Sequence, residues 1–241
     1  MNIITELVVA NRILATEDVV DAYGHVSVRN PENPQRFFLA HSKSPSLVEA
    51  DDIVEHTLDG QAAKPEKRSL YLERFIHAAI YEARPDVIAV VHAHAEDVLP
   101  FTITKPALKP VIHSGAFIGA EVPVWDIADE FGDQTNLLVI NIAQGRGLAR
   151  KLGSRNVALM RGHGFAAAAR SLIDVVRMSV YLPRNARVQF KAMLLGEFKP
   201  LSQGEIDARA AGTGYKPDSP ETQRAWQYWA QRAGVAHLLK T

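Results

Sequence analysis

Apolar positions along this chain recur with two different periods, and the changes between them mark the expected elements. Near the amino terminus, apolar residues from Ile3 to Leu14 return every three or four positions, which predicts an amphipathic helix. Two short runs with β character follow at His25–Arg29 and Arg36–Ala40, and the segment between them is rich in Asn and Pro. This pattern predicts a β-hairpin.

The rest of the chain alternates between strand-like and helix-like segments. We expect strands at Ile53–Leu58, Val87–Val91, Leu137–Ile142 and Asn156–Met160. We expect helices over Ser69–Arg84, over Arg146–Leu152, from Ser171 towards Gly196, and from Ser219 onwards. Because the elements do not follow a regular βαβ order, the sequence predicts an α/β fold with three α/β/α layers and a mixed central sheet. We expect residues 1–241 to form a single domain with a helical extension over about residues 200–241.

Composition narrows the classes of function. The chain has 241 residues, with 27 Lys and Arg against 27 Asp and Glu, so its formal charge is zero. Nucleic-acid-binding proteins usually carry a basic excess, so we expect no nucleic-acid partner. Cysteine is absent, which excludes disulfides, thiolate metal sites and a cysteine nucleophile. The first residues do not resemble a signal peptide, and no apolar run is long enough to span a bilayer, so we expect a cytoplasmic protein with no membrane partner.

The strongest chemical signal is His92-Ala93-His94, which follows the apolar run Val87–Val91. On a strand, residues two apart point to the same face, so the two imidazoles are expected side by side at the end of a buried strand. Two adjacent cationic rings would repel each other. The pair is therefore better suited to be neutral and to share a bound cation.

Two further residues extend this signal. His163 lies between Gly162 and Gly164 after another apolar strand, and flanking glycines allow a sharp turn that brings a third imidazole close. Glu73 is expected on the inward side of a helix, where a carboxylate needs a cation or hydrogen-bond donors. Three histidines and one carboxylate suit Zn²⁺, Mn²⁺, Co²⁺ or Fe²⁺. A lone buried histidine is more often a core residue than a ligand, and we interpret His77, one turn beyond Glu73, as a structural or supporting residue.

Other polar residues are candidates for binding a substrate. His25 and Arg29 share one face of a predicted strand with Ser27, which is either a polar wall of the site or a solvated hairpin face. Ser42 and Lys43 lie in a loop that could bind a carboxylate or phosphate, although a plain surface loop fits equally well.

Two more candidates come from the second half of the chain. Arg161 directly precedes the Gly-His-Gly turn and could bind an anion beside a metal. Tyr215 follows Gly212-Thr213-Gly214, in a segment that could close over the site.

Taken together, these motifs resemble the class II aldolase/adducin family. The resemblance runs through His25–Arg29, Asp51–Val54, Glu73, His92–His94 and Gly162–Gly164, and covers most of residues 3 to 195. It implies a class II aldolase-like catalytic domain with one divalent metal ion per subunit, held by His92, His94, His163 and Glu73. The ion would be Mn²⁺ or Zn²⁺, with Fe²⁺ or Co²⁺ as alternatives. The resemblance also implies a homotetramer with sites at subunit boundaries.

The first motif and the following loop indicate a branch of this family. Sugar-phosphate aldolases typically carry Gly-Asn in the first motif and a Thr-x-Ser-Gly phosphate loop, whereas this chain has Gly24-His25 and His41–Pro45. Together with Tyr71–His77, these residues look most like the decarboxylase branch, which acts on hydroxylated aromatic or pyridine dicarboxylates in the catabolism of such rings.

The resemblance therefore implies a metal-dependent lyase that stabilises an enolate or phenolate. Glu73 is the expected proton donor, His25 is a second candidate, and Arg29, Lys43 and Arg161 are expected to hold a substrate carboxylate. One alternative is an aldolase that cleaves a hydroxy-keto acid or a sugar phosphate. A second alternative, from a different class, is a non-catalytic adducin-like interaction module.

Overall fold

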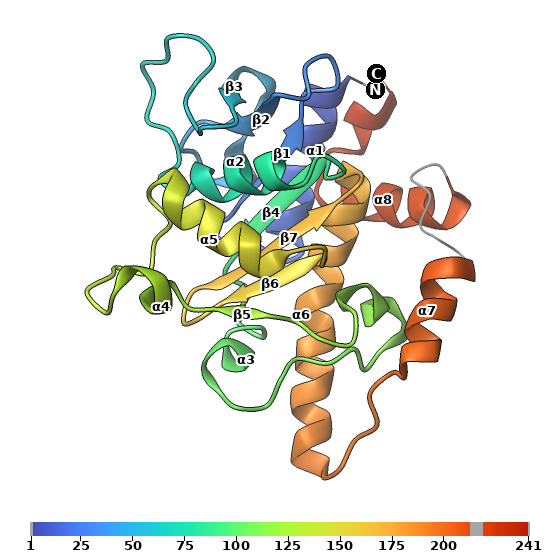
Figure 1. Cartoon of the computed structure of the whole chain (residues 1–241). Helices are drawn as coiled ribbons and strands as arrows, with labels where there is room; N and C mark the ends of the chain where they lie inside the picture. Colours follow the sequence, from blue (N-terminus) through green and yellow to red (C-terminus); the bar gives the residue numbers. More distant parts are fainter. Residues whose placement is uncertain (1, 213–218, 241) are drawn as a thin grey trace.

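A seven-stranded mixed sheet forms the centre of the protein (Figure 1). The computed structural model describes residues 2–212 and 219–240. The strands are β1 (His25–Arg29), β2 (Arg36–Ala40), β3 (Ile53–Thr57), β4 (Ala89–Ala93), β5 (Val124–Trp125), β6 (Val157–Met160) and β7 (Gly164–Ala169). They lie in the order β3-β2-β1-β4-β7-β6-β5, and all neighbours are antiparallel except the parallel pair β5 and β6. The predicted mixed central sheet is confirmed.

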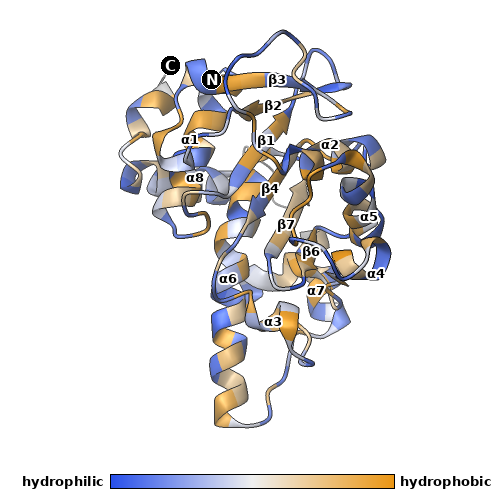
Figure 2. Ribbon diagram, turned by 90° about the vertical axis from the view of Figure 1, so that its left-hand side faces the viewer, coloured by the Kyte–Doolittle hydropathy of each residue, from blue (hydrophilic) through white to orange (hydrophobic). Residues whose placement is uncertain are grey.

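Helices cover both faces of this sheet, so the predicted three layers are also confirmed (Figure 2). On one face lie α1 (Ile3–Thr16), α6 (Leu172–Leu195) and α8 (Pro220–Arg232), which share a buried apolar cluster with the strands. On the other face, α2 (Arg74–Ala83) and α5 (Ile142–Leu152) pack over a second cluster. Shorter elements are α3 (Pro100–Ile103), α4 (Ile127–Phe131), α7 (Gln203–Gly212) and the 3₁₀ turns η1 (Pro45–Leu47), η2 (Ala50–Asp52), η3 (His113–Ile118) and η4 (Ala236–Lys240).

Several predicted elements form because their ends carry the expected signals. The hairpin β1–β2 has the predicted bounds and pairs Val28 with Phe38. At the start of α6, the Ser171 hydroxyl accepts a hydrogen bond from the Asp174 N–H, and Ser219 does the same for Thr222 at the start of α8. Among the described residues, no helix combines the length and the hydrophobicity that crossing a bilayer would require.

Two predictions about the second face were wrong. The helix expected from Ser69 begins only at Arg74, which leaves Glu73 as the residue just before it. The apolar segment Leu137–Ile142 contains no strand, because its last residue already starts α5 and the rest has irregular backbone. Only Val139 of this segment is buried and Ile140 is exposed, so its apolar residues predicted neither strand pairing nor burial of the whole run.

β7 lies between β4 and β6 in the sheet and is not predicted from the sequence. Its sequence, Gly-Phe-Ala-Ala-Ala-Ala, has few of the β-branched residues that favour strands. The strand is fully buried and pairs His92 of β4 with Ala166. Ala166 and Ala168 pack in the α2/α5 cluster, so burial between two strands compensates for the weak strand propensity.

Side chains of β4 alternate between the two faces. Ala89, Val91 and Ala93 pack with the α1/α6/α8 cluster, whereas Val90 packs with the α2/α5 cluster. His92 therefore faces the layer of α2 and α5. β1 shows the same alternation. Val26 and Val28 pack with the α1/α6/α8 cluster, so His25, Ser27 and Arg29 face α2.

Gly164 begins β7 at a point of close backbone approach. A Cβ there would lie under 3.0 Å from the carbonyl oxygen of Ala93. A real side chain at this position would push β7 away from β4, at the place where the two histidine-bearing segments meet.

We expect Gly164→Ala to lower the free energy of unfolding by roughly 2–4 kcal/mol, because the clash involves backbone that cannot move aside easily. Urea denaturation would measure this change. Gly204→Ala is the control, because the nearest atom to its added Cβ is Ser202 Oγ at 3.9 Å, and helix propensity predicts no loss of stability. Equal stability of the two variants would contradict the close approach.

Candidate metal centre

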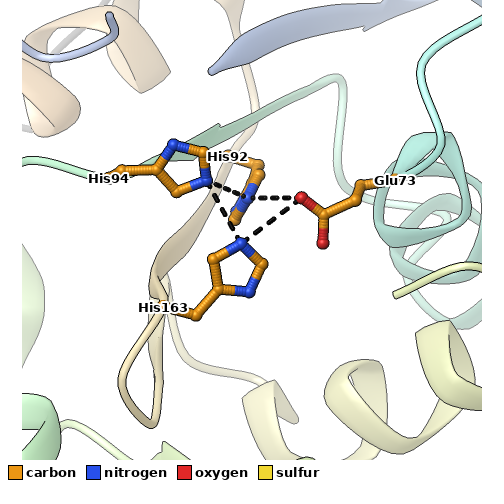
Figure 3. A group of neighbouring side chains, drawn as sticks. All are labelled: Glu73, His92, His94 and His163. Atoms are coloured by element: carbon orange, nitrogen blue, oxygen red, sulfur yellow. Dashed lines mark hydrogen bonds and ion pairs between the residues drawn. The ribbon is translucent and has the colours of Figure 1, made fainter. Parts of the chain in front are cut away.

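Three imidazoles and one carboxylate converge just beyond the end of β4 (Figure 3). One potential ligand atom from each of Glu73, His92, His94 and His163 lies within 4.8 Å of the others. The Nε2 atom of His94 is 3.0 Å from Nε2 of His92 and 3.2 Å from Nε2 of His163. Oε2 of Glu73 is 3.2 Å from Nε2 of His92 and 3.4 Å from Nε2 of His163. The structure therefore brings together all four predicted metal-binding residues.

His92 is held in a single tautomer by the sheet. Its Nδ1 donates a hydrogen bond of 3.0 Å to the carbonyl oxygen of Phe165 in β7. Because a carbonyl can only accept, Nδ1 carries a proton, and in the neutral form of the ring Nε2 then presents a lone pair to the cluster. A backbone carbonyl behind an imidazole is the usual partner of a metal-binding histidine.

His163 reaches the cluster from the tight turn between β6 and β7. Gly162 has φ +62°, a conformation that favours glycine, and its N–H donates to Thr102 Oγ1 at 3.0 Å. The His163 N–H donates to the Met160 carbonyl at 3.1 Å. These hydrogen bonds fix the turn. The side chain of His163 points from it towards His92 and Glu73 (Figure 3).

Glu73 uses its two carboxylate oxygens for different purposes. Oε1 accepts a hydrogen bond of 3.0 Å from the Val139 N–H, so the irregular segment that was predicted as a strand serves as its anchor. Oε2 faces the histidines. Burial opposes ionisation of this side chain, but the neighbouring imidazoles of His92 and His163 outweigh it and lower the pKa of Glu73. The carboxylate is therefore ionised.

The donor set fits a divalent cation. Burial, followed by the proximity of His92 and His163, lowers the pKa of His94 to about 4, so its ring is neutral at neutral pH. A neutral His94 can donate at most one hydrogen bond from Nε2. This atom nevertheless has two nitrogen atoms at hydrogen-bond distance, Nε2 of His92 and Nε2 of His163. In the neutral ring of His92, Nε2 presents a lone pair and cannot donate to His94. Four ligands at about 2.1 Å from a tetrahedral ion would be about 3.4 Å apart, close to the observed separations. The residues present therefore suit one ion, whose identity the geometry leaves open.

His25 lies beside this cluster, at the end of β1. It is paired with His92 across the two strands, and the two ring centroids are 5.2 Å apart. Its Nδ1 is 2.7 Å from Nε2 of His77, which the sequence suggested as a supporting residue. Burial, followed by the proximity of His77, lowers the pKa of His25 well below its usual range. His25 is therefore a neutral neighbour of the four residues.

Arg29 does not reach the site. Its guanidinium donates to the carbonyl oxygens of Tyr81, Arg84, Val87 and Pro34 and is almost fully buried. These bonds use the fork of donors that a substrate carboxylate would need. The structure thus gives Arg29 the role of joining β1 to the end of α2, in place of the predicted substrate contact.

The loop with Ser42 and Lys43 lies near the site through Tyr71. The Tyr71 hydroxyl donates to the Lys43 carbonyl, and its ring packs on His25 with centroids 4.6 Å apart. Burial raises the pKa of Tyr71 to about 12, so the hydroxyl keeps its proton. The Lys43 ammonium is paired with Asp52 at 2.7 Å, and Ser42 is exposed with its N–H bonded to the Ser69 carbonyl.

Arg161 and Tyr215 are the two remaining candidates for substrate binding. The Arg161 guanidinium is half exposed and paired with Asp126. Tyr215 lies outside the described residues. The Tyr71–His77 motif was noted in the sequence, but the sequence assigned no site role to Tyr71 itself or to the Val139 N–H. Tyr71 lies two residues before Glu73, which was a usable signal, whereas a backbone N–H leaves no trace in the sequence.

Comparison with known proteins places the chain in a family. The profile described as Class II Aldolase and Adducin N-terminal domain matches residues 5–190. The chain therefore belongs to the class II aldolase/adducin family, as the resemblance implied. The most similar proteins include Decarboxylase tropJ from Talaromyces stipitatus, which is 35% identical over 94% of this chain and 92% of its own length.

A second relative and one solved structure support the same family. The 3,4-dihydroxyphthalate decarboxylase of Arthrobacter keyseri is 29% identical, over 95% of this chain and 93% of its own length. The L-fuculose 1-phosphate aldolase from Glaciozyma antarctica PI12 superposes with a TM-score of 0.76 at 22% identity, over 96% of this chain and 89% of that chain. At this identity the structural similarity shows the fold alone.

We expect the protein to bind one divalent ion per chain, and His94→Ala to lose it. Removing a ligand should weaken binding by more than the roughly 10- to 100-fold that loss of an outer supporting residue costs. Elemental analysis of the purified protein and titration with Zn²⁺ and Mn²⁺ would measure this. His237→Ala is the control, because His237 is exposed and outside the cluster. Unchanged metal content in His94→Ala would refute the site.

Proposed function

We propose that the protein is a metal-dependent decarboxylase of a hydroxylated aromatic or pyridine dicarboxylate. The observation that carries this proposal is the convergence of three histidines on the carboxylate of Glu73. This constellation occurs in a chain whose two relatives described above, similar over almost its whole length, are both named as decarboxylases. One of those names specifies a dihydroxylated aromatic dicarboxylate.

Loss of CO₂ from such a ring requires a place for the electron pair of the broken carbon–carbon bond. His92, His94, His163 and Glu73 would hold the ion, and when bound it supplies Lewis-acid stabilisation of a negative charge on the substrate oxygen. The ring hydroxyl beside the departing carboxylate is the group that would carry this charge.

Glu73 can move the proton that the reaction needs. Glu73 is an ionised carboxylate anchored through Oε1, and its Oε2 accepts the proton of the substrate hydroxyl. Glu73 then returns this proton to the ring carbon that bears the departing substrate carboxylate. The bond to the carboxylate then breaks, CO₂ leaves, and its electron pair restores the aromatic ring as a phenolate. Water supplies the last proton on release. Glu73 ends the cycle ionised, as it began.

The second substrate carboxylate needs a cation or hydroxyl partner. We propose Ser42 and Lys43 for this role, because Tyr71 joins their loop to His25. Arg161 is a second candidate, since it is half exposed and precedes His163 by two residues. Each cation would have to exchange its present carboxylate partner for the substrate. Tyr215 remains a proposal from the sequence, and Arg29 is left out because its donors are occupied.

We also propose a homotetramer, as the family resemblance implies. The carboxyl-terminal part of α6 projects beyond the sheet (Figure 1) and exposes Val188, Phe190, Leu194 and Leu195. Exposed apolar side chains of this kind are typical of surfaces that a second chain covers. Light scattering on the purified protein should give four chain masses, and a monomer would contradict this proposal.

A substrate panel tests the reaction class. We expect CO₂ release from hydroxybenzene or hydroxypyridine dicarboxylates in the presence of Mn²⁺ or Zn²⁺, and no aldehyde from sugar phosphates or hydroxy-keto acids. Aldehyde formation without any CO₂ release would establish the aldolase alternative. Full metal content with no turnover, together with tight binding of another protein, would establish the adducin-like alternative.

We expect Glu73→Gln to lower kcat by about 10²- to 10⁴-fold, the usual contribution of a proton-transferring side chain. The amide keeps only one oxygen, which can serve the ion or the Val139 N–H but not both, so metal binding should weaken but persist through the three histidines. Steady-state kinetics and elemental analysis would separate the two effects. Glu121→Gln, a change at an exposed carboxylate that pairs with Arg155, is the control and should retain full activity. Unchanged kcat in Glu73→Gln would remove this residue from the reaction.

A further inference from the structure

Four buried polar side chains form a continuous chain of hydrogen bonds that starts beside the metal cluster. Nδ1 of His25 is 2.7 Å from Nε2 of His77, and Nδ1 of His77 is 2.6 Å from Ser27 Oγ. Ser27 Oγ is 2.8 Å from the Tyr81 hydroxyl. All four are at most 2% exposed. The chain links β1 to α2 and leads away from His92 into the core.

The direction of these bonds can be deduced from the far end. The Tyr81 hydroxyl has one proton and two acceptors within reach, Ser27 Oγ at 2.8 Å and the Ile88 carbonyl at 3.4 Å. That carbonyl already accepts a hydrogen bond of 2.7 Å from the Arg29 N–H. Tyr81 therefore donates to Ser27, which is the much shorter of the two contacts.

Arg29 reinforces this direction. Its guanidinium carbon lies 4.7 Å from the centre of the Tyr81 ring. A cation over the ring makes the phenol a better hydrogen-bond donor. The buried Arg29, which the sequence suggested as a substrate contact, thus acts on the chain through Tyr81.

The donation from Tyr81 to Ser27 determines the direction of the other hydrogen bonds in the chain. Ser27 accepts from Tyr81 and gives its own proton to Nδ1 of His77. A neutral His77 then carries its proton on Nε2 and donates to Nδ1 of His25. Burial, followed by the proximity of His92, lowers the pKa of His77 well below its usual range, which agrees with a neutral ring. His25 consequently accepts at Nδ1 and carries its own proton on Nε2.

The proton on Nε2 of His25 has no acceptor among the residues that the structure describes. The ring lies between Tyr71 and His92, with centroids 4.6 Å and 5.2 Å away. An N–H that has no acceptor in the protein is available to an oxygen atom of a ligand. A donor at this position, one ring away from the ion cluster, is suited to an oxygen atom of a bound substrate.

We propose that His25 is a neutral hydrogen-bond donor to a substrate oxygen, and that His77, Ser27 and Tyr81 are positioning residues that fix its tautomer. This rests on the proposed decarboxylase function and makes it more specific. A neutral imidazole that donates to an oxygen on which charge develops stabilises the transition state without being deprotonated. Glu73 alone then moves the proton to carbon, and His25 binds the oxygen.

The tautomer can be read without any turnover. Two-bond ¹⁵N–¹H correlation spectra of the ¹⁵N-histidine-labelled protein, recorded with and without Zn²⁺, distinguish a proton on Nε2 from one on Nδ1. His25→Gln and His77→Gln would assign the signals. We expect His25 and His77 both to carry the proton on Nε2 in the wild-type protein. A proton on Nδ1 of His25 would overturn the proposal.

Kinetics then separate hydrogen bonding from folding. We expect His25→Leu to lower kcat by about 100-fold or more at unchanged metal content, and His25→Gln to recover most of it, since the amide N–H can replace Nε2. His77→Leu should lower kcat by about 10- to 100-fold, and His77→Gln should restore it, because the amide can accept from Ser27 and donate to His25. Equal kcat in His77→Leu and His77→Gln would overturn the role of His77.

His56→Leu is the matched control. His56 is equally buried and stacks on Phe37, but its Nδ1 donates only to the Val54 carbonyl and it is not part of the chain. We expect wild-type kcat and an unchanged His25 spectrum in this variant. If the wild-type protein released no CO₂ from any member of the panel, the proposed function would fail, and the spectra would still decide between the two tautomers of His25.

Discussion

The convergence of Nε2 from three histidines with Oε2 of Glu73 is the constraint on which the rest of this structure depends. Neutral imidazoles at this spacing cannot satisfy one another, because His92 already donates its only proton to the Phe165 carbonyl and presents a lone pair. A buried carboxylate beside them needs positive charge. A single divalent ion meets both needs, and the surrounding backbone holds the four side chains at separations that suit it.

The backbone achieves this by bringing three separate segments to one end of β4. The strand itself supplies His92 and directs His94, the β6–β7 turn supplies His163, and the residue before α2 supplies Glu73. The lack of a side chain at Gly164 lets β7 approach Ala93, and the irregular backbone at Val139 reaches across to hold Oε1 of Glu73. Hydrogen bonds to the backbone hold the side chains of His92 and Glu73 in place.

The polar face of β1 contributes both to the site and to the packing of α2, and residue type alone does not show which residue does which. His25 lies against the metal cluster, whereas Arg29, four residues later on the same face, joins the end of α2 to the strand through backbone carbonyls. Ser27 and Tyr81 connect them. The protein thereby uses a structural arginine to orient hydrogen bonds that end beside the site, so the stability of this face and the chemistry of the site are coupled.

The sequence by itself determined the hairpin, the long capped helix and the four residues of the candidate metal centre, because strand periodicity, helix caps and the His-x-His and Gly-His-Gly motifs are local patterns. The tertiary structure decided what depends on contacts between distant segments. It formed β7 from an alanine-rich stretch of weak strand propensity, because β4 and β6 lie on either side of it. The tertiary structure also left Leu137–Ile142 without a strand. It directed the Arg29 guanidinium to four carbonyl groups, three of which lie more than fifty residues away along the chain. Local patterns record which side chains can bind, whereas burial and partners are set only when the layers pack.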